Sequence, residues 1–452
     1  MKRGFERYAR WFYPGLGVKR WLLVAVIGAV LLFNGLQRYL TAEGADIPIN
    51  QYVDEIMLQL HVPLGSLAYA FAVLGLVLVG IGIRQWTRSI VAAVAPASSV
   101  RIVDRLLDRR LRAGYRIVAI GGGTGLSTLL RGLKRSTSNL TAVVTVSDDG
   151  GSSGRLQKEL GILPPGDVRN CLVALADDEA LVTALFGHRF SEGEGLSGHA
   201  FGNLFIAAMT AITGNFDRAI QESSRVLNIK GRVLPSTLVA VRLRATLRDG
   251  SAVCGETNIS RSHAPIAALA LEPANAQPLP ETLEAIRNAD AIVLGPGSLY
   301  TSILPNFLVD GIARAVAESS AVKIYVCNVM TQPGETDAFT AAAHVEALLA
   351  LSGEPVCDLV IVNEQPPQRL LETYREGGQV PVLPDRSALE ALGVRVIGAN
   401  VISETETVRH DATRLAEVVL RLIDEEVARR STFVRMHAPP PSAPAPAATK
   451  GA

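Results

Sequence analysis

The sequence Arg-Ile-Val-Ala-Ile-Gly-Gly-Gly-Thr-Gly at residues 116–125 joins a short apolar run to a glycine-rich turn. A helical spacing of apolar residues follows, at Leu126, Leu129, Leu130 and Leu133. A strand, a tight turn and a helix in this order bring bare backbone N–H groups and the positive end of a helix to a place where an anion can approach. The turn lacks the Gly-Lys-Ser/Thr of a Walker A loop, and Leu126 stands where the dinucleotide fingerprint has its third glycine. The segment therefore predicts a phosphate-binding turn of another kind; a tight turn without a ligand is the alternative.

Short apolar runs alternate with longer helical patterns from residue 115 to residue 435. This alternation is typical of an α/β domain around a mainly parallel sheet. Residues 239–248 instead alternate apolar and mostly charged side chains before Asp249-Gly250, which predicts an added antiparallel hairpin with one wet face. The expected strands of the parallel sheet are Arg116–Ile120, Ala142–Val146, Ala291–Leu294, Lys323–Cys327, Asp358–Val362 and Val394–Ala399.

Composition limits the class of protein. The chain has 452 residues, a formal net charge of +1 and 48% hydrophobic residues. This balance is too apolar for a disordered protein and too neutral for a dedicated nucleic-acid-binding protein. The four cysteines lie far apart without a CxxC spacing, which indicates neither a zinc site nor a disulfide framework and favours a reducing compartment.

Two uncharged apolar runs lie near the N-terminus, at residues 21–37 and 62–83. The second has 22 residues, enough at the helical rise to cross the roughly 30 Å hydrocarbon layer of a bilayer. We expect both runs to be transmembrane helices. A cleaved signal peptide is the alternative for the first, although no A-x-A cleavage pattern follows Phe33. A buried helical hairpin of a soluble domain is the alternative for the pair.

Basic residues predict how these spans are oriented. Six Lys and Arg residues precede the first span, and Arg84, Arg88 and Arg101 follow the second. Arg38 stands almost alone in the connecting loop, which is otherwise acidic. Because Lys and Arg are enriched on the cytoplasmic side of a membrane, both termini and the α/β domain are expected in the cytoplasm.

The chain is therefore expected to have five parts. An amphipathic pattern at residues 100–112 either lies on an anionic lipid surface or simply links the anchor to the domain. The last residues are rich in Pro and Ala and are expected to be disordered. The parts are a basic cytoplasmic N-terminus at 1–20, two transmembrane helices with a short external loop at 21–84, a linker at 85–114, the α/β domain at 115–435 and the tail at 436–452.

A pair of acids follows the second expected strand, in Ser-Asp-Asp-Gly-Gly-Ser-Ser-Gly-Arg at residues 147–155. In a doubly wound fold this position lies beside the first glycine turn, where an acid can bind a ribose hydroxyl or a cation. Asp148 and Asp149 suit Mg²⁺ together with a nucleotide diphosphate. Because Mg²⁺ keeps several waters and takes phosphate oxygens, a complete protein cage is not expected. A turn without a ligand is the alternative.

Two polar motifs follow. Pro-Pro-Gly-Asp-Val-Arg-Asn at residues 164–170 places Asp167 as a helix cap, with Arg169 and Asn170 available to a ligand. Gly-His-Ala-Phe-Gly-Asn at residues 198–203 opens another helical stretch. His199 is a candidate general base, but no Ser or Cys nucleophile motif accompanies it, which favours a structural or ligand-bonding role.

A second glycine turn, Gly-Pro-Gly-Ser-Leu-Tyr-Thr-Ser at residues 295–302, follows another expected strand. Open α/β sheets bind ligands at the carboxyl ends of their strands, so two such loops predict an elongated anionic ligand. Polar residues at 328–336 follow the next strand and are suited to reading a sugar or a base. Near the end, Arg409 is a candidate phosphate clamp and Asp411 the expected cap of the final helix.

These motifs supply the candidate site. The candidate ligand-binding residues are Gly121, Gly122, Gly123, Thr124, Gly125, Asp148, Asp149, Gly150, Gly151, Ser152, Ser153, Asp167, Arg169, Asn170, His199, Gly202, Asn203, Gly295, Gly297, Ser298, Asn328 and Arg409, and the candidate metal ligands are Asp148 and Asp149.

The order of six of these motifs resembles the gluconeogenesis factor family, the YvcK-like branch of the CofD-like superfamily. They are residues 121–125, 147–155, 164–170, 198–203, 295–302 and 328–336. The resemblance covers residues 116–424. It implies a Rossmann-like α/β fold with helices on both faces of the sheet, binding of UDP-sugars such as UDP-N-acetylglucosamine, and a part in bacterial carbon metabolism, cell shape and wall synthesis. Cell-wall synthesis proteins and further copies of the chain are the protein partners it suggests.

The other branch of this superfamily comprises the 2-phospho-L-lactate transferases, which join a phospholactyl group to a deazaflavin precursor using an activated nucleotide and Mg²⁺. By this resemblance residues 122–125 would face the nucleotide, and Asp148 and Asp149 would match acids that serve the metal or the acceptor. Residues 148–154 follow the form of the gluconeogenesis factors, which puts transferase activity in doubt. The two spans depart from the usual soluble form and imply a domain held at the inner membrane.

Three functions are consistent with these residues. The leading hypothesis is a membrane-tethered UDP-sugar-binding regulator without turnover. The alternative is a Mg²⁺-dependent transferase in which Asp148 and Asp149 hold the metal against the diphosphate. An NAD-dependent oxidoreductase rests on the glycine-rich opening alone and lacks an evident hydride-transfer acid.

Overall fold

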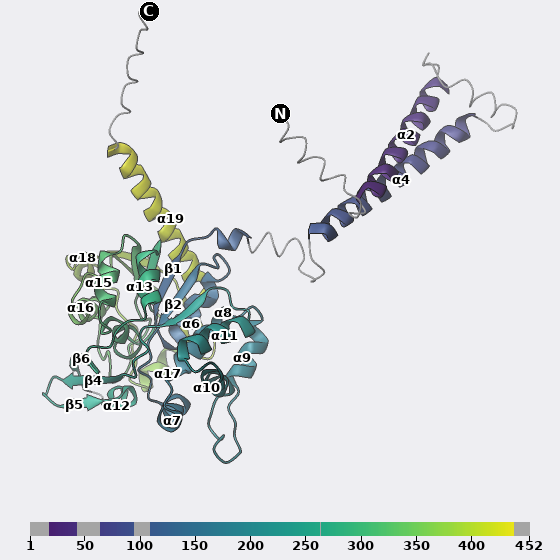
Figure 1. Cartoon of the computed structure of the whole chain (residues 1–452). Coiled ribbons are helices and arrows are strands. Elements are labelled where there is room, and N and C mark those ends of the chain that lie inside the picture. The colour runs from purple at the N-terminus through teal and green to yellow at the C-terminus, as the bar shows by residue number, and fades with distance from the viewer. Residues whose placement is uncertain (1–17, 43–63, 95–108, 263, 438–452) are drawn as a thin grey trace, which may run out of the picture. The chain divides into compact units, whose positions relative to one another are not determined.

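The structure is a computed structural model that describes residues 18–42, 64–94, 109–262 and 264–437. The chain divides into two compact units, residues 1–107 and residues 108–452 (Figure 1). Outside the described residues lie 1–17 of the predicted basic N-terminus, 43–63 with most of the predicted external loop, 100–108 of the predicted amphipathic segment, and 438–452 of the predicted tail.

The first unit is a pair of apolar helices, α2 (Val18–Ala42) and α4 (Leu64–Val94). Glycines lie where the two backbones approach, since a Cβ on Gly28 would be 2.6 Å from the backbone nitrogen of Val79. Small residues allow such close helix packing. Both helices are long and apolar enough to cross a membrane by length and composition. Large apolar side chains point outward, with exposed fractions of 61% for Leu23, 66% for Phe33 and 63% for Leu76.

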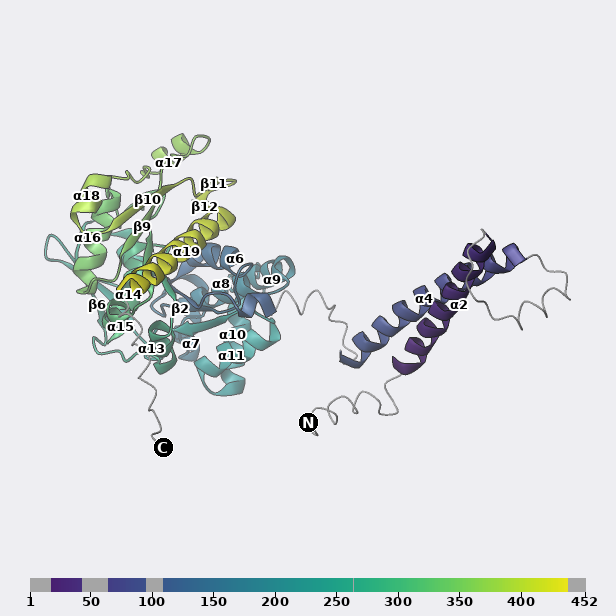
Figure 2. The same ribbon diagram turned by 90° about the horizontal axis from the view of Figure 1, so that it is seen from above.

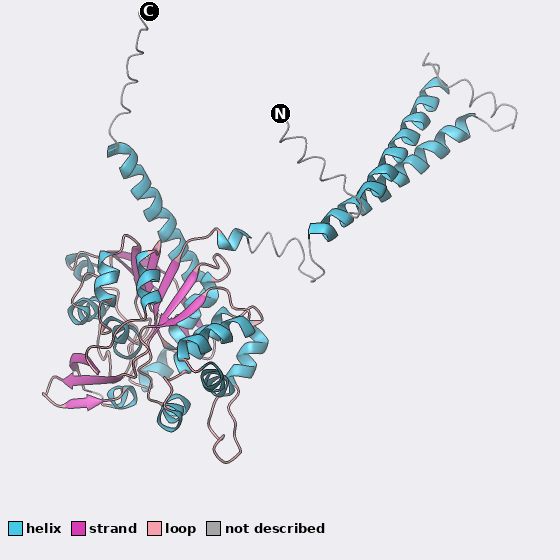
Figure 3. Ribbon diagram, in the orientation of Figure 1, coloured by secondary structure: helices cyan, strands magenta, loops and turns pink. Residues whose placement is uncertain are grey.

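A seven-stranded sheet, parallel throughout, forms the centre of the second unit, in the order β10-β9-β8-β7-β1-β2-β3. Its inner strands, among those drawn in magenta in Figure 3, are almost entirely buried and mostly apolar, as strands covered on both faces require. Lys323 in β8 is a charged exception. All six predicted strands are present, with ends that differ from the prediction by at most two residues. The strands are β1 (Ile117–Gly121), β2 (Leu140–Val144), β3 (Arg232–Pro235), β7 (Ala291–Leu294), β8 (Val322–Val326), β9 (Leu359–Asn363) and β10 (Arg395–Ala399).

Helices flank this sheet (Figure 2). The long α19 packs against α6, and a Cβ on Gly132 would lie 2.7 Å from the Cβ of Ala416. Asp411 caps α19 as expected, because its carboxylate accepts the backbone N–H groups of Thr413 and Arg414. The helices are α6 (Gly123–Leu133), α7 (Gly151–Leu160), α8 (Gly166–Leu175), α9 (Glu179–Gly187), α10 (Phe201–Thr213), α11 (Phe216–Val226), α12 (Glu256–Arg261), α13 (Pro280–Arg287), the π-helix η2 (Leu299–Ile303), α14 (Leu304–Phe307), α15 (Ile312–Glu318), α16 (Ala341–Ser352), α17 (Leu371–Glu376), α18 (Arg386–Ala391) and α19 (Ala412–His437).

Two small antiparallel sheets complete the unit. The predicted hairpin is present as β4 (Arg242–Leu247) and β5 (Ala252–Cys254), and β4 alternates buried and exposed residues as expected. A strand that the sequence pattern did not predict, β6 (Ile266–Glu272), pairs with β4, so the hairpin belongs to a separate three-stranded sheet. The second small sheet pairs β11 (Ile402–Glu404) with β12 (Val408–His410).

Candidate functional site

The first glycine turn lies at the carboxyl end of β1. Gly122 is extended, and Gly123 begins α6 with a φ of +65°. Side chains disfavour this left-handed conformation, so the turn needs a glycine at residue 123. The first four N–H groups of any α-helix have no acceptor within the helix, and those of α6 begin at this turn. The sequence prediction of a strand, a glycine turn and a helix is confirmed here.

The second glycine turn follows β7 and touches the first. A Cβ on Gly125 would lie 3.0 Å from the Cα of Gly297 and closer still to the carbonyl oxygen of Pro296. One on Gly121 would lie 3.7 Å from the Cα of Gly295, whose φ is +78°. The two turns therefore meet backbone to backbone, with no side chain between them at these positions.

A cavity of about 330 Å³ opens at the carboxyl ends of β1, β7 and β8. It lies where the sheet order reverses between β1 and β7, the place where open α/β sheets bind ligands. Its lining residues are Gly122, Gly123, Thr124, Gly125, Thr128, Pro296, Gly297, Ser298, Ser302, Asn328, Val329, Met330, Thr331, Gln332, Tyr374, Gln379, Val408, Arg409 and His410.

The electrostatics of this cavity suit an anion. Among the described residues that line it, Arg409 is the only formally charged one, and none is an Asp or a Glu. The His410 ring donates to the carbonyl oxygen of Cys327 at 3.2 Å. Burial lowers the pKa of His410 to about 4, so this ring is neutral at physiological pH. Arg409 itself lies on the exposed side of β12, where its guanidinium can reach a ligand.

Asp167 lies on the other side of the first glycine turn. Burial, followed by the nearby Asp148, raises the pKa of Asp167 to about 7, while a backbone hydrogen bond from Gly123 opposes the shift. The carboxyl group also leaves no room for a Cβ on Gly122. The expectation that Asp167 caps α8 is wrong. Pro165 holds the N-cap position, and Asp167 in the first turn instead binds the glycine loop.

The two acids after β2 are held by backbone and by α12. Asp148 accepts the N–H of Gly150 at 2.9 Å. Asp149 accepts the backbone N–H of Thr257 at 3.0 Å and its hydroxyl at 2.9 Å. Because α12 lies between β5 and β6 in the sequence, the three-stranded sheet positions α12 beside the turn that carries Asp148 and Asp149.

Two further acids approach these groups, and the sequence analysis did not single them out. Burial, followed by Asp148 and Asp167, raises the pKa of Glu256, whose Oε2 atom has no hydrogen-bond partner within the described chain. Glu335 accepts from the hydroxyl groups of Ser298 and Ser260, and burial raises its pKa. Glu335 lies inside the predicted 328–336 motif. Glu256 belongs to no sequence motif, and it reaches these acids because α12 lies between β5 and β6 of the three-stranded antiparallel sheet.

The His-containing motif forms a buried network with α7. The Nδ1 atom of His199 lies 3.0 Å from the hydroxyl of Ser152, which accepts from Asn203 at 3.1 Å. The Oδ1 atom of Asn203 accepts from Arg169 at 3.0 Å, and the second terminal nitrogen of Arg169 donates to Asn170. Burial lowers the pKa of His199. The side chain of His199 is 2% exposed, which fits the structural role rather than that of a general base.

The structure therefore divides the predicted site residues into two groups. One lines the cavity, namely Gly122, Gly123, Thr124, Gly125, Gly297, Ser298, Asn328 and Arg409. The other lies outside the lining, namely Gly121, Asp148, Asp149, Gly150, Gly151, Ser152, Ser153, Asp167, Arg169, Asn170, His199, Gly202, Asn203 and Gly295. The groups meet at the first glycine turn, where Asp167 bonds Gly123.

The described acids do not by themselves form a complete Mg²⁺ site. Within residues 18–42, 64–94, 109–262 and 264–437, no three side chains of His, Cys, Asp or Glu come together as a metal site. One oxygen of Asp149 is already engaged by Thr257. A Mg²⁺ ion at Asp148 and Asp149 would therefore depend on phosphate oxygens of a nucleotide and on water.

Comparison with known proteins gives consistent matches. The sequence profile of the family described as 2-phospho-L-lactate transferase CofD matches residues 117–402. A protein of Nostoc sp. named "Putative gluconeogenesis factor" is 46% identical over 433 residues, which is 92% of each chain. The "Gluconeogenesis factor" of Bacillus subtilis is 49% identical over 312 residues, covering 69% of this chain and 98% of that protein.

The fold has a counterpart among solved structures. The crystal structure of a member of the UPF0052 family from Bacillus halodurans matches with a TM-score of 0.66 and 50% sequence identity. The match covers 68% of this chain and 99% of that chain. The match thus spans nearly all of that chain, whereas the Nostoc alignment covers a larger share of this chain, 92%.

Proposed function

The chain belongs to the gluconeogenesis factor family and contains its CofD-type domain, and from this premise we propose that it is a membrane-tethered, non-catalytic binder of a UDP-sugar such as UDP-N-acetylglucosamine. In this proposal the nucleotide reports the state of carbon metabolism during gluconeogenic growth. The liganded domain then acts on cell shape and wall synthesis, through contacts with cell-wall synthesis proteins at the bacterial inner membrane.

The observation that carries the proposal is the contact between the two glycine turns. Gly125 and Gly297 bring two segments of bare backbone together at the mouth of one cavity. Main-chain N–H groups at a helix start favour phosphate groups. Arg409 adds a cation on the same cavity, and no acid lines it. A nucleoside diphosphate linked to a sugar is elongated and anionic, and fits this arrangement.

Membrane tethering rests on α2 and α4. Their outward faces expose large apolar side chains such as Leu23, Phe33 and Leu76, which water disfavours and lipid accepts. The bias of Lys and Arg toward the flanks of the spans supports a cytoplasmic location for both termini, and with them the α/β domain.

A Mg²⁺-dependent transferase is the second candidate, because the match to the 2-phospho-L-lactate transferase profile and the acids beside the first glycine turn favour it. In that case Asp148 and Asp149 would hold the metal against the diphosphate, with Glu256 close by. The absence of acids from the cavity lining favours the binder.

Thermal unfolding of the full chain in a neutral detergent, with UDP-N-acetylglucosamine, UDP-glucose, GDP, NAD and Mg²⁺, tests both candidates. A ligand at 100 times its dissociation constant stabilises by about 2.7 kcal/mol. The binder predicts that UDP-sugars give the largest stabilisation and that EDTA leaves it intact. Stabilisation by GDP or NAD alone would contradict UDP-sugar binding, and loss of the UDP-sugar effect in EDTA would favour the transferase.

A further inference from the structure

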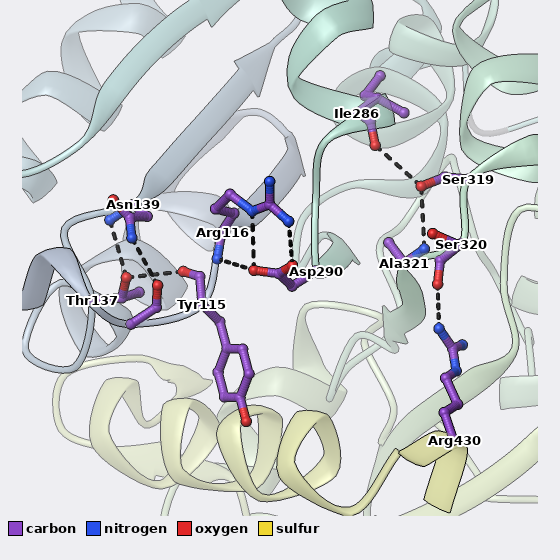
Figure 4. Close-up of polar contacts among 11 residues, drawn as sticks. Tyr115, Arg116, Thr137, Asn139, Ile286, Asp290, Ser319, Ser320, Ala321 and Arg430 are labelled. Atoms are coloured by element: carbon purple, nitrogen blue, oxygen red, sulfur yellow. Dashed lines mark hydrogen bonds and ion pairs between the residues drawn. The ribbon is translucent and has the colours of Figure 1, made fainter. Parts of the chain in front are cut away.

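A second hollow lies at the opposite end of the parallel sheet, near the amino ends of β1, β7 and β8. Its volume is about 250 Å³, and its lining residues include Arg116, Arg287, Asp290, Ser320 and Arg430. All of these except Arg287 are labelled in Figure 4. These residues belong to none of the motifs that build the nucleotide cavity. They come from the residue before β1, the end of α13, the turns before β7 and β8, and α19.

The hollow is positively charged. Asp290 is its one acid, and it is bound by Arg116, with 2.6 Å between Nη2 and Oδ1 and 3.2 Å between Nε and Oδ2. The Arg430 guanidinium donates to the backbone carbonyl of Ser320, not to an acid. Arg287 has no ion pair with a described residue and is exposed. Three arginines thus face one carboxylate, which leaves a formal charge of +2 among the lining residues.

Helix ends account for part of this arrangement. Arg287 lies in the last turn of α13, where a cation balances the negative end of the helix. Balancing the end of a helix does not require a concave surface. It also does not explain the position of Arg430, which reaches across from α19 to the turn before β8 (Figure 4). Guanidinium groups that converge on one concavity match the oxygens of a phosphate, because each presents several N–H donors in a plane.

The chain also enters the α/β domain at this edge. The hydroxyl of Tyr115 donates to Asp424 on α19 at 2.7 Å, and the backbone carbonyl of Tyr115 accepts from Thr137 at 2.9 Å. Asn139 donates to the carbonyl oxygens of Arg112 and Gly114. The segment that leads from the apolar helices is thus fastened beside the hollow, and the exposed Arg109, Arg110 and Arg112 belong to it.

We propose that this hollow binds a phosphate group, and that the phosphate is that of an anionic lipid headgroup. This inference rests on the membrane tethering proposed above, because the segment fastened at Tyr115 joins this edge of the domain to the apolar helices along the chain. The domain then docks on the membrane through the amino edge of its sheet and leaves the nucleotide cavity at the carboxyl edge free. Anionic headgroups attract basic residues close to the membrane surface.

The test uses the full chain in a neutral detergent. Short-chain phosphatidylglycerol, short-chain phosphatidylcholine and inorganic phosphate are titrated, and binding is measured by calorimetry and by thermal unfolding. The variant is Arg287→Gln with Arg430→Gln. The matched control is Arg225→Gln with Arg421→Gln, which removes the same charge from two exposed ion pairs elsewhere.

Wild type and control are expected to bind phosphatidylglycerol more tightly than phosphatidylcholine, with inorganic phosphate as a weak competitor. The double variant should lose roughly tenfold or more of that affinity, and Arg287→Lys with Arg430→Lys should lie between. Equal binding by the double variant and the control would overturn the site. Binding of inorganic phosphate without phosphatidylglycerol would overturn the lipid assignment. UDP-sugar affinity, measured on the same samples, should stay unchanged in every variant, so a failure of the nucleotide proposal is seen separately.

Discussion

The backbone N–H of Gly123 donates a hydrogen bond to the carboxyl group of Asp167, at the point where β1 becomes α6. This contact joins the proposed nucleotide cavity to the acidic group beyond it. Asp167 bonds the first glycine turn without lining the cavity, whereas Thr124 and Gly125 line it. The protonation state of one carboxyl is therefore coupled to the shape and charge of the proposed phosphate site.

Asp167 should make both stability and ligand binding depend on pH. The pKa of Asp167 is about 7 in the folded protein, against 3.8 ordinarily. Between these two pH values the folded state keeps a proton on this carboxyl group that the unfolded state has lost. Its contribution is therefore fully present below pH 4 and is lost as pH rises to 7, by up to about 4 kcal/mol. Affinity for a UDP-sugar should also fall between pH 6 and pH 8, because the ionised carboxylate repels the diphosphate.

Asp167→Asn removes the titrating group and keeps an oxygen that can accept from Gly123. We expect the variant to have a flatter pH profile, both in denaturant unfolding and in UDP-sugar calorimetry, than the wild type. A variant with the same pH profile as the wild type would show that Asp167 does not govern either property.

Gly125→Ala should separate the two glycine turns. The added Cβ would press on the carbonyl of Pro296 and on the Cα of Gly297, and such overpacking costs about 1–3 kcal/mol. UDP-sugar affinity should fall at least tenfold in calorimetry, because the backbone groups no longer meet. Gly187→Ala is the control, since nothing lies within 4 Å of its added Cβ. Equal UDP-sugar affinities in the two variants would show that the contact between the turns is not needed for binding.

Arg409→Gln should weaken binding of the anionic part of the ligand. A hydrogen bond to a charged group contributes about 1.5–3 kcal/mol, which corresponds to roughly a 10- to 150-fold loss of affinity. Arg375→Gln on α17 is the control, because Arg375 is exposed and pairs with Glu372 outside the cavity lining. The loss should shrink for uridine, which carries no phosphate. An equal loss for uridine and the UDP-sugar would assign Arg409 to the base or ribose instead.

Asp149→Asn distinguishes the two proposed functions. The amide oxygen still accepts from Thr257, so the turn should keep its shape while one negative charge is lost. For a binder without metal, UDP-sugar affinity changes little, with or without Mg²⁺. A loss seen only in Mg²⁺-containing buffer would support the transferase.

Local patterns were sufficient to predict much of this fold. Residues 116–125 and 291–297 each show an apolar strand followed by glycine, and both turns form as expected. The edge strand β3 was missed because it is short and ends in Pro235, a residue that sheets accept at an edge. The strand β6 was missed because its pairing with β4 spans the loop and helix between them.

The site was predicted less completely, for a physical reason. Sequence order suggests which strand ends meet, but not which side of a turn a side chain occupies. Asp167 was assigned to a helix cap, yet it reaches back to Gly123. Glu256 arrives on α12, far from the motifs in sequence. Thr331 and Gln332 line the cavity from within the predicted 328–336 motif, whereas Tyr374 lines it only because α17 brings it there.

The most direct test is a crystal structure of the protein with UDP-N-acetylglucosamine bound. The account predicts diphosphate oxygens within hydrogen-bond distance of main-chain N–H groups in both residues 123–125 and residues 297–298, with Arg409 beside them. Nucleotide density at another surface, or a diphosphate that contacts side chains alone, would contradict the account.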